Sequence, residues 1–166
     1  DFYLEPVTFN EIPGFLIEAL VATEDRRFFQ HWGIDPLSLA RAAIVNLKQG
    51  KIKQGGSTLT QQLAKNLFLV FDRSVERKVR ELLLALWLEM SFTKEQILTL
   101  YLNRVYFGSG VFGLRAAAEY YFGKSVSDLR VKEAAMLIGI LKAPSKYNPR
   151  TNFALAKKRA TQVLNN

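Results

Sequence analysis

Apolar residues recur every three or four positions along almost the whole chain, which is the spacing of amphipathic α-helices. Alternating patterns typical of strands are scarce. The pattern predicts helices at residues 12–25, 36–49, 58–69, 74–90, 94–103, 112–122, 130–141 and 152–164. We therefore expect a single, mainly α domain over residues 1–166.

Three of these helices begin with a local start signal. Pro36 suits the first position of a helix, because its φ angle is already helical and its missing N–H needs no partner. Two pairs have the spacing of a capping box, in which each side chain bonds the other residue's backbone N–H: Thr58 with Gln61, and Thr93 with Gln96.

Charge and composition narrow the class of protein. The chain has 23 Lys and Arg against 15 Asp and Glu, a formal charge of +8, which favours an anionic partner such as nucleic acid, phosphate-bearing lipid or an acidic membrane surface. With one histidine and no cysteine, a zinc site is improbable.

The longest apolar runs, at 82–88 and 134–141, are far shorter than the roughly 20 residues that span a bilayer. The chain begins "DFYLEPV", without an initiator Met or a signal peptide, so we expect a domain excised from a longer protein.

Two motifs imitate known sites. "GSGVFG" (108–113) matches the dinucleotide pattern G-x-G-x-x-G, but that fingerprint needs a βαβ unit, and its surroundings here are helical. We expect a tight loop between helices. "SFTK" (91–94) matches the S-x-x-K of penicillin-binding serine acyltransferases without its K-T-G or S-D-N partners, so Ser91 and Thr93 are interpreted as helix caps.

The helix predicted at 74–90, extended back by one turn, carries an arginine stripe: Arg73, Arg77 and Arg80. Apolar residues occupy its opposite side: Val75, Val79, Leu82, Leu86 and Met90. Leu84 and Leu88 continue the arginine stripe, so that face should pass from solvent into protein at about Glu81.

Glu81 at this transition should be partly desolvated, and Arg77 and Lys78 can keep it charged. An ordinary ion pair on a helix surface explains the same residues about equally well. The four cations of "RSVERKVR" exceed what one Glu needs, which favours an external anion.

The stretch "GGSTLTQQLAKN" (55–66) offers a second place for that anion. Ser57 and Thr58 open a helix whose free N–H groups and positive dipole end attract negative charge. Gln61 and Lys65 share one face of the helix. Alone, the stretch could simply be a well-capped surface helix, but together with the arginine stripe it predicts two cationic walls suited to a diphosphate.

Glu24 ends an otherwise apolar predicted helix. The negative end of the helix dipole and neighbouring aromatic side chains should raise its pKa toward that of a general base, although Arg26 and Arg27 oppose this. His31 is the rival base, but a single histidine beside Phe28, Phe29 and Trp32 is more often a hydrogen-bonded packing residue, and we expect it to form scaffold with Phe28 and Trp32. Asp25 could cap or orient its surroundings.

Five long motifs in order resemble the peptidoglycan glycosyltransferase family, glycosyltransferase family 51: "ATEDRRFFQHWGID", "GGSTLTQQLAKN", "RKVRELLLALWLE", "ILTLYLNRVYFGSGVFGLRAAAEYYFG" and "EAAMLIGILKAPSKYNP". This family comprises the transglycosylase domains of class A penicillin-binding proteins and the monofunctional transglycosylases. The resemblance implies a lysozyme-like α-helical fold with a head lobe and a smaller, membrane-associated jaw lobe.

The resemblance also implies the reaction, which is polymerisation of lipid II into β-1,4-linked glycan with inversion and release of polyprenyl diphosphate. Glu24 matches the general base, and Glu81 matches a second acid that assists the diphosphate region. The remaining matches are substrate-binding residues: Asp25, Ser57, Gln61, Lys65, Arg73 and Arg80. No cofactor is implied with certainty; a divalent cation, Mg²⁺ or Mn²⁺ held by Glu81, is the one candidate.

The implied partners are lipid II, the growing glycan chain, the membrane surface, a C-terminal transpeptidase domain and other cell-wall synthesis proteins, but no nucleic acid. The implied location is the outer face of the bacterial cytoplasmic membrane, with residues after Gly33 dipping into the lipid.

Two other classes of function stay open at this point. A muramidase-like hydrolase would share the helical scaffold but would have little use for a diphosphate-binding stripe. A noncatalytic module that binds nucleic acid or membrane would explain the charge, and its salt-sensitive binding would be indifferent to Glu24 and Glu81.

Overall fold

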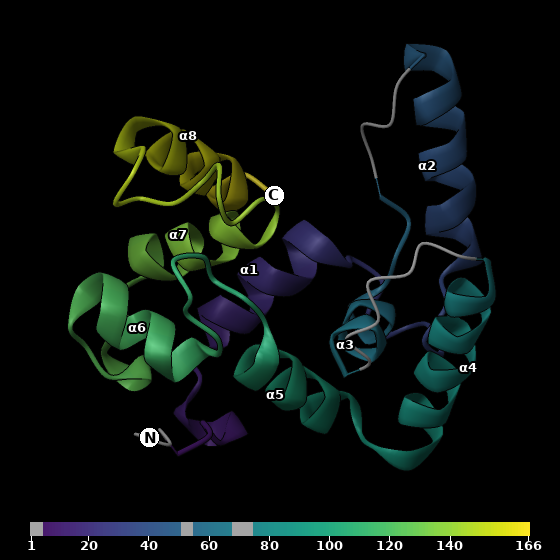
Figure 1. The fold of residues 1–166 in the computed structure, drawn as a ribbon, viewed down its shortest axis with the longest axis horizontal. Coiled ribbons are helices and arrows are strands. Elements are labelled where there is room, and N and C mark those ends of the chain that lie inside the picture. The colour runs from purple at the N-terminus through teal and green to yellow at the C-terminus, as the bar shows by residue number, and fades with distance from the viewer. Residues whose placement is uncertain (1–4, 51–54, 68–74) are drawn as a thin grey trace. The chain divides into compact units, whose positions relative to one another are not determined.

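The computed structural model describes residues 5–50, 55–67 and 75–166, and these are mainly helical (Figure 1). The helices are α1 (Gly14–Glu24), α2 (Pro36–Gln49), α3 (Leu59–Leu67), α4 (Val75–Ser91), α5 (Lys94–Arg104), α6 (Leu114–Phe122), α7 (Val131–Leu141) and α8 (Phe153–Leu164). Two short 3-10 helices add to them, η1 (Phe9–Glu11) and η2 (Val126–Asp128). The predicted mainly α class is confirmed, and every predicted helix end that falls within the described ranges is right to within two residues.

The predicted start signals are confirmed. Asp35 caps α2 by accepting a hydrogen bond from the backbone N–H of Ser38, and Pro36 follows it in the first turn. In the box at α3, the N–H of Thr58 donates to Gln61 Oε1 at 2.8 Å, and the N–H of Gln61 donates to Thr58 Oγ1 at 3.1 Å. Thr93 and Gln96 form the same pair of bonds at 2.9 and 3.2 Å.

The chain divides into two compact units, each of which is described by itself. The first comprises residues 1–26 and 98–166, and the second comprises residues 27–97. The boundary therefore falls directly after the "TEDR" sequence at the end of α1 and again inside α5.

The core of the first unit is built on α7, whose residues after the first turn are all apolar. It packs along α8 and α1 and touches α6 (Figure 1). Leu16 and Leu20 of α1 and Ile138 of α7 are fully buried in this core. Packing of this kind holds the end of α1, and hence Glu24, on a rigid support.

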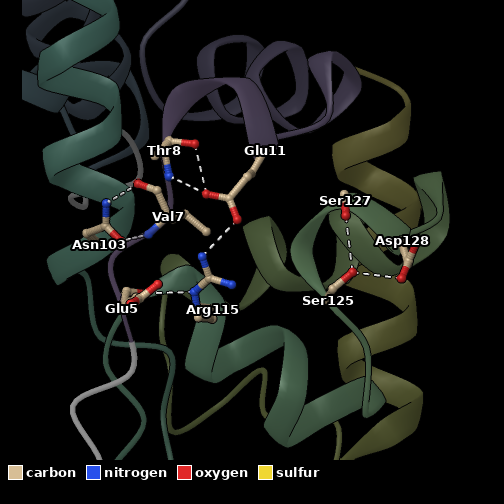
Figure 2. Close-up of polar contacts among 9 residues, drawn as sticks. All are labelled: Glu5, Val7, Thr8, Glu11, Asn103, Arg115, Ser125, Ser127 and Asp128. Carbon is tan, nitrogen blue, oxygen red and sulfur yellow. Dashed lines mark hydrogen bonds and ion pairs between the residues drawn. The ribbon is translucent and has the colours of Figure 1, made fainter.

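The segment that precedes α1 is bonded to α5 and α6 (Figure 2). Asn103 accepts from the N–H of Val7 at 2.8 Å and donates to its carbonyl oxygen at 2.9 Å. Arg115 donates to the carbonyl of Glu5 at 2.7 Å and pairs with the carboxylate of Glu11 at 2.8 Å. Residues 5–11 are thus part of the folded unit.

The "GSGVFG" motif forms a tight loop between α5 and α6, as predicted. An isolated antiparallel bridge joins Tyr106 and Phe112 across it. Gly113 has φ +83° and its Cα lies so close to Asn103 that an added Cβ would stand 2.8 Å from the Asn103 carbonyl oxygen. Because the described residues contain no β-strand, the motif lacks the context that dinucleotide binding requires.

In the second unit, α3 packs against α4 (Figure 1). Leu59 and Leu63 of α3 and Ala85 and Leu88 of α4 are buried there. Phe28 and His31 are also buried, as predicted for scaffold residues. The same prediction was wrong for Trp32, which is 71% exposed, because nothing in the described part of the second unit covers its ring.

Candidate functional site

The predicted site residues fall in both units. Glu24 and Asp25 belong to the first. The second contains Ser57, Gln61, Lys65, Arg80 and Glu81. Arg73 lies outside the described residues. The site residues of each unit are therefore described separately.

Glu24 is the last residue of α1, where the negative end of the helix dipole lies. It is half-buried and lies near Tyr101 of α5, which is almost completely buried. Burial, and secondarily the negative charge of Glu24, raise the pKa of Tyr101. Asp25 is buried and ends the helix, with its N–H donating to the Val21 carbonyl oxygen at 3.0 Å. The carboxylate pair thus sits at a partly buried helix end.

The two arginines that follow are held by local bonds. Arg26 Nε donates to the carbonyl oxygen of Ala22 in the last turn of α1, at 3.1 Å. Arg27, in the second unit, pairs with buried Asp35 at 3.3 Å. Burial alone would raise the pKa of Asp35, but hydrogen bonds from Ser38 and the charge of Arg27 outweigh this and lower it. Arg26 and Arg27 are therefore structural cations in this arrangement.

Glu81 lies where the sequence pattern placed a change from solvent to protein. Its carboxylate is buried, with 6% of the side chain exposed, and it accepts from Lys78 Nζ at 2.6 Å. Leu88, two turns further along the same face, is buried. The predicted desolvation of Glu81 and its predicted ion pair with Lys78 are both confirmed.

Arg80 has a partner that the sequence reasoning overlooked. It pairs with Glu76 at 2.5 Å, and the two side chains are 75% and 70% exposed. The signal was available, because Glu76 and Arg80 have the i, i+4 spacing of helix ion pairs. Such exposed pairs contribute at most about 1 kcal/mol, so a multiply charged anion can take the place of Glu76.

The N-terminus of α3 is firmly seated. Thr58 and Gln61 are buried, and the side-chain oxygen of Gln61 is engaged in the capping box. Gly56 lies against α2, where an added Cβ would stand 3.1 Å from Leu39 Cα. Ser57, just before the helix, and Lys65, in its last turn, are exposed. Each of these side chains is therefore open to an anion that approaches its own end of α3.

A metal site built by the protein alone is not found in the described ranges, which contain no group of three or more His, Asp and Glu side chains able to hold an ion. No helix within those ranges combines the length and the apolar character that a membrane span needs.

Comparison with known proteins adds to this geometry. A family model described as "Transglycosylase" matches residues 2–166. The chain is 54% identical over 158 residues to penicillin-binding protein 1A of Aquifex aeolicus (strain VF5), an alignment that covers 95% of this chain and 22% of that protein. Penicillin-binding protein 1F of Bacillus subtilis (strain 168) is 48% identical over 160 residues, covering 96% of this chain and 22% of that protein. Penicillin-binding protein 1A of Pseudomonas aeruginosa is 47% identical over 159 residues, covering 96% and 19%. The chain thus spans about a fifth of the length of these relatives.

Proposed function

Because this chain belongs to the transglycosylase family, we propose that it is a peptidoglycan glycosyltransferase that polymerises lipid II in bacterial cell-wall synthesis. The observation that carries the proposal is the family match over residues 2–166. A carboxylate pair at a partly buried helix end and a set of cations on α3 and α4 supply the two kinds of group that the reaction needs.

In the proposed mechanism, Glu24 is the general base. Its carboxylate takes the proton of the 4-hydroxyl of the acceptor sugar, and that oxygen attacks the anomeric carbon of the donor. The bond from the anomeric carbon to the diphosphate breaks, and the diphosphate leaves with the electron pair, which inverts the configuration from α to β. Asp25, adjacent and buried, supports the orientation of Glu24.

The cations act on the leaving group. Negative charge develops on the departing diphosphate, and fixed positive groups stabilise that charge most strongly where water is scarce. We assign this role to Lys65 and Arg80, and by resemblance to Arg73, with exposed Ser57 helping to place the diphosphate. Gln61, which the resemblance implies as a substrate-binding residue, is buried in the capping box and acts by holding the start of α3. Arg80 exchanges Glu76 for the substrate when it binds.

Glu81 assists the same region, and a divalent cation is a separate proposal. Magnesium in phosphate-handling sites commonly takes one or two carboxylates and completes its shell with phosphate oxygens and water. Glu81 is the only carboxylate that we assign here, so the residues fit an ion held chiefly by the substrate and not a protein-built cage. If activity persists in excess chelator and does not rise when Mg²⁺ or Mn²⁺ is added, the reaction does not need a divalent cation.

Membrane association is the third part of the proposal, and we assign the smaller, second unit as the membrane-associated jaw lobe. Leu37, Ile44 and Leu47 share one exposed face of α2, with Arg41 and Lys48 on the same face. An exposed helix face that combines apolar and basic side chains can contact an anionic membrane through both the apolar area and the positive charge. This arrangement supports contact with an anionic membrane surface. By resemblance to the family, we place that surface at the outer face of the cytoplasmic membrane and expect further domains, such as a transpeptidase, in the whole protein.

The decisive experiment is a lipid II polymerisation assay with this chain and its Glu24→Gln variant. Glutamine keeps the size of the side chain and removes the base, so we expect elongation to fall by at least about a hundredfold while the thermal unfolding midpoint stays unchanged. Release of sugar from finished peptidoglycan, with no polymerisation, would instead identify a hydrolase. An active Glu24→Gln protein would exclude Glu24 as the base.

A further inference from the structure

A series of hydrogen bonds links α3 to α4 in the second unit and ends on α3, the helix at which it begins. It starts at α3, where Thr58 Oγ1 donates to the carbonyl oxygen of Gly33 at 2.6 Å. The N–H of Gly33 in turn donates to His31 Nδ1 at 3.0 Å.

The series of hydrogen bonds continues through two charged side chains, those of Lys94 and Glu89. Lys94 Nζ, at the start of α5, donates to the carbonyl oxygen of His31 at 2.7 Å and to Glu89 Oε1 of α4 at 2.7 Å. Glu89 Oε1 also accepts from Thr60 Oγ1 at 2.7 Å, which brings the path back to α3 two residues after Thr58. We call this set the polar ring: Thr58, Gly33, His31, Lys94, Glu89 and Thr60.

The polar ring is shielded from water. The side chains of Glu89 and Lys94 are 5% and 22% exposed, and Thr60 is fully buried. Lys94 Nζ also lies 4.5 Å from the centre of the buried Phe28 ring. Charges buried in this way are tolerated only when each has its partners, so loss of one member leaves another unpaired.

The ring also has a tight steric fit at Gly33. This residue has φ +87°, and an added Cβ would stand 3.0 Å from the carbonyl oxygen of Ala85 and 3.1 Å from Glu89 Cγ. The backbone at Gly33 is therefore pressed against α4, and through Thr58 it fixes where α3 begins.

We propose that the polar ring holds the first turn of α3 in the geometry that binds the substrate diphosphate, and that Glu89, Lys94 and Thr60 are positioning residues for that turn. The proposal rests on the proposed function, in which this end of α3 helps to hold the diphosphate. Donors that bind an anion well are fixed in place beforehand by packing and by a supporting shell of hydrogen bonds. Thr60 is a buried residue of α3 itself, and it binds the buried carboxylate of Glu89 on α4, so both act on the substrate only through the backbone of α3.

The test compares Thr60→Val, which keeps the shape and loses the hydroxyl, with Thr60→Ser, which keeps the hydroxyl. With the full chain and lipid II, Thr60→Val should raise KM about tenfold and change kcat by less than about twofold, because binding of the diphosphate weakens in the ground state and transition state alike. Thr60→Ser should stay within about twofold of the parent in both constants. The pH dependence of kcat should be unchanged in both variants. Lys94→Met should reproduce the effect of Thr60→Val from the other side of the ring.

Amide hydrogen exchange provides a readout that needs no activity. In Thr60→Val the amides of Gln61 and Gln62 should exchange at least about tenfold faster, while the amides of α8 keep their rates. Equal KM values for the Val and Ser variants, a fall in kcat with KM unchanged, or unaltered exchange at α3 would each overturn the proposal. If the parent chain does not polymerise lipid II, the proposed function fails by itself, and the exchange rates still decide whether the ring positions α3.

Discussion

Single residues in the stretch "ATEDRRFFQHWGID" have different physical roles although they are neighbours in sequence. Glu24 ends a helix and lies beside a buried tyrosine, whereas His31 is a buried member of the polar ring. The prediction that His31 packs was correct, because its ring is buried against Phe28 and accepts a hydrogen bond from the N–H of Gly33. The same reasoning failed for Trp32, since large apolar residues are also found on surfaces that meet a partner.

Gly33 permits a direct test at this scale. Replacement by alanine adds a Cβ at φ +87° and within 3.0 Å of a backbone oxygen, so Gly33→Ala should lower the free energy of unfolding by more than about 1 kcal/mol. Gly50→Ala is the matched control, because its φ is +62° but no atom lies within 4 Å. Denaturant unfolding of both variants measures the difference, and equal losses would show that crowding at Gly33 costs nothing.

Glu76 is a second residue-scale test. If Arg80 gives up Glu76 to bind the diphosphate, Glu76→Gln removes a competitor and should lower KM for lipid II by a factor of up to about five, the range expected for an exposed ion pair. Steady-state kinetics at low salt measures this. A higher KM in Glu76→Gln would mean that Glu76 helps to hold Arg80 for the substrate.

At the scale of elements, helix positions could be predicted because apolar spacing and capping residues act within one or two turns. The 3-10 helices η1 and η2 were missed because three residues are too few to show a period. On α4 the burial predicted further along the arginine stripe is confirmed at Leu88, yet the opposite side is exposed at Val79, Leu86 and Met90. Periodicity identifies an apolar face without saying what covers it.

The turn at η1 makes the stability of the first unit depend on pH. Bonds from the backbone N–H and hydroxyl of Thr8, and then from Arg115, lower the pKa of Glu11 from 4.5 to about 2. A carboxyl with a depressed pKa in the folded state stabilises fully above its unfolded pKa, and this stabilisation is lost as pH falls through its folded pKa. Stability should therefore fall between about pH 5 and pH 2, and Glu11→Gln should be less stable at pH 7 and show a weaker fall. Urea unfolding at pH 7 and pH 3 tests this, and an identical pH dependence in Glu11→Gln would exclude Glu11 as its source.

At the scale of the whole molecule, most large apolar side chains that are exposed in the described residues belong to the second unit. On α2 they occur with basic residues, which is the combination that anionic lipid attracts. The uneven distribution supports the proposal that the second unit is the one that contacts the membrane.

Vesicle binding tests this division. The double variant Ile44→Ser with Leu47→Ser removes two exposed apolar side chains from α2 and should reduce binding to phosphatidylglycerol-containing vesicles by at least about tenfold. Leu164→Ser removes an exposed leucine from α8 of the first unit and should leave binding unchanged. Co-sedimentation measures both, and equal losses in the two proteins would contradict the assignment of α2.

The sequence by itself determined the helices, their caps, the order of the motifs and the family, because these depend on neighbours within a few residues or on long, specific strings. It also indicated that Glu81 would be desolvated. Only the tertiary structure decided which polar groups support α3, since the bonds of the polar ring join residues 25, 29 and 63 positions apart. Thr60, Glu89 and Lys94 look like ordinary helix residues in the sequence, and only packing α3 against α4 removes them from water and gives them one another as partners.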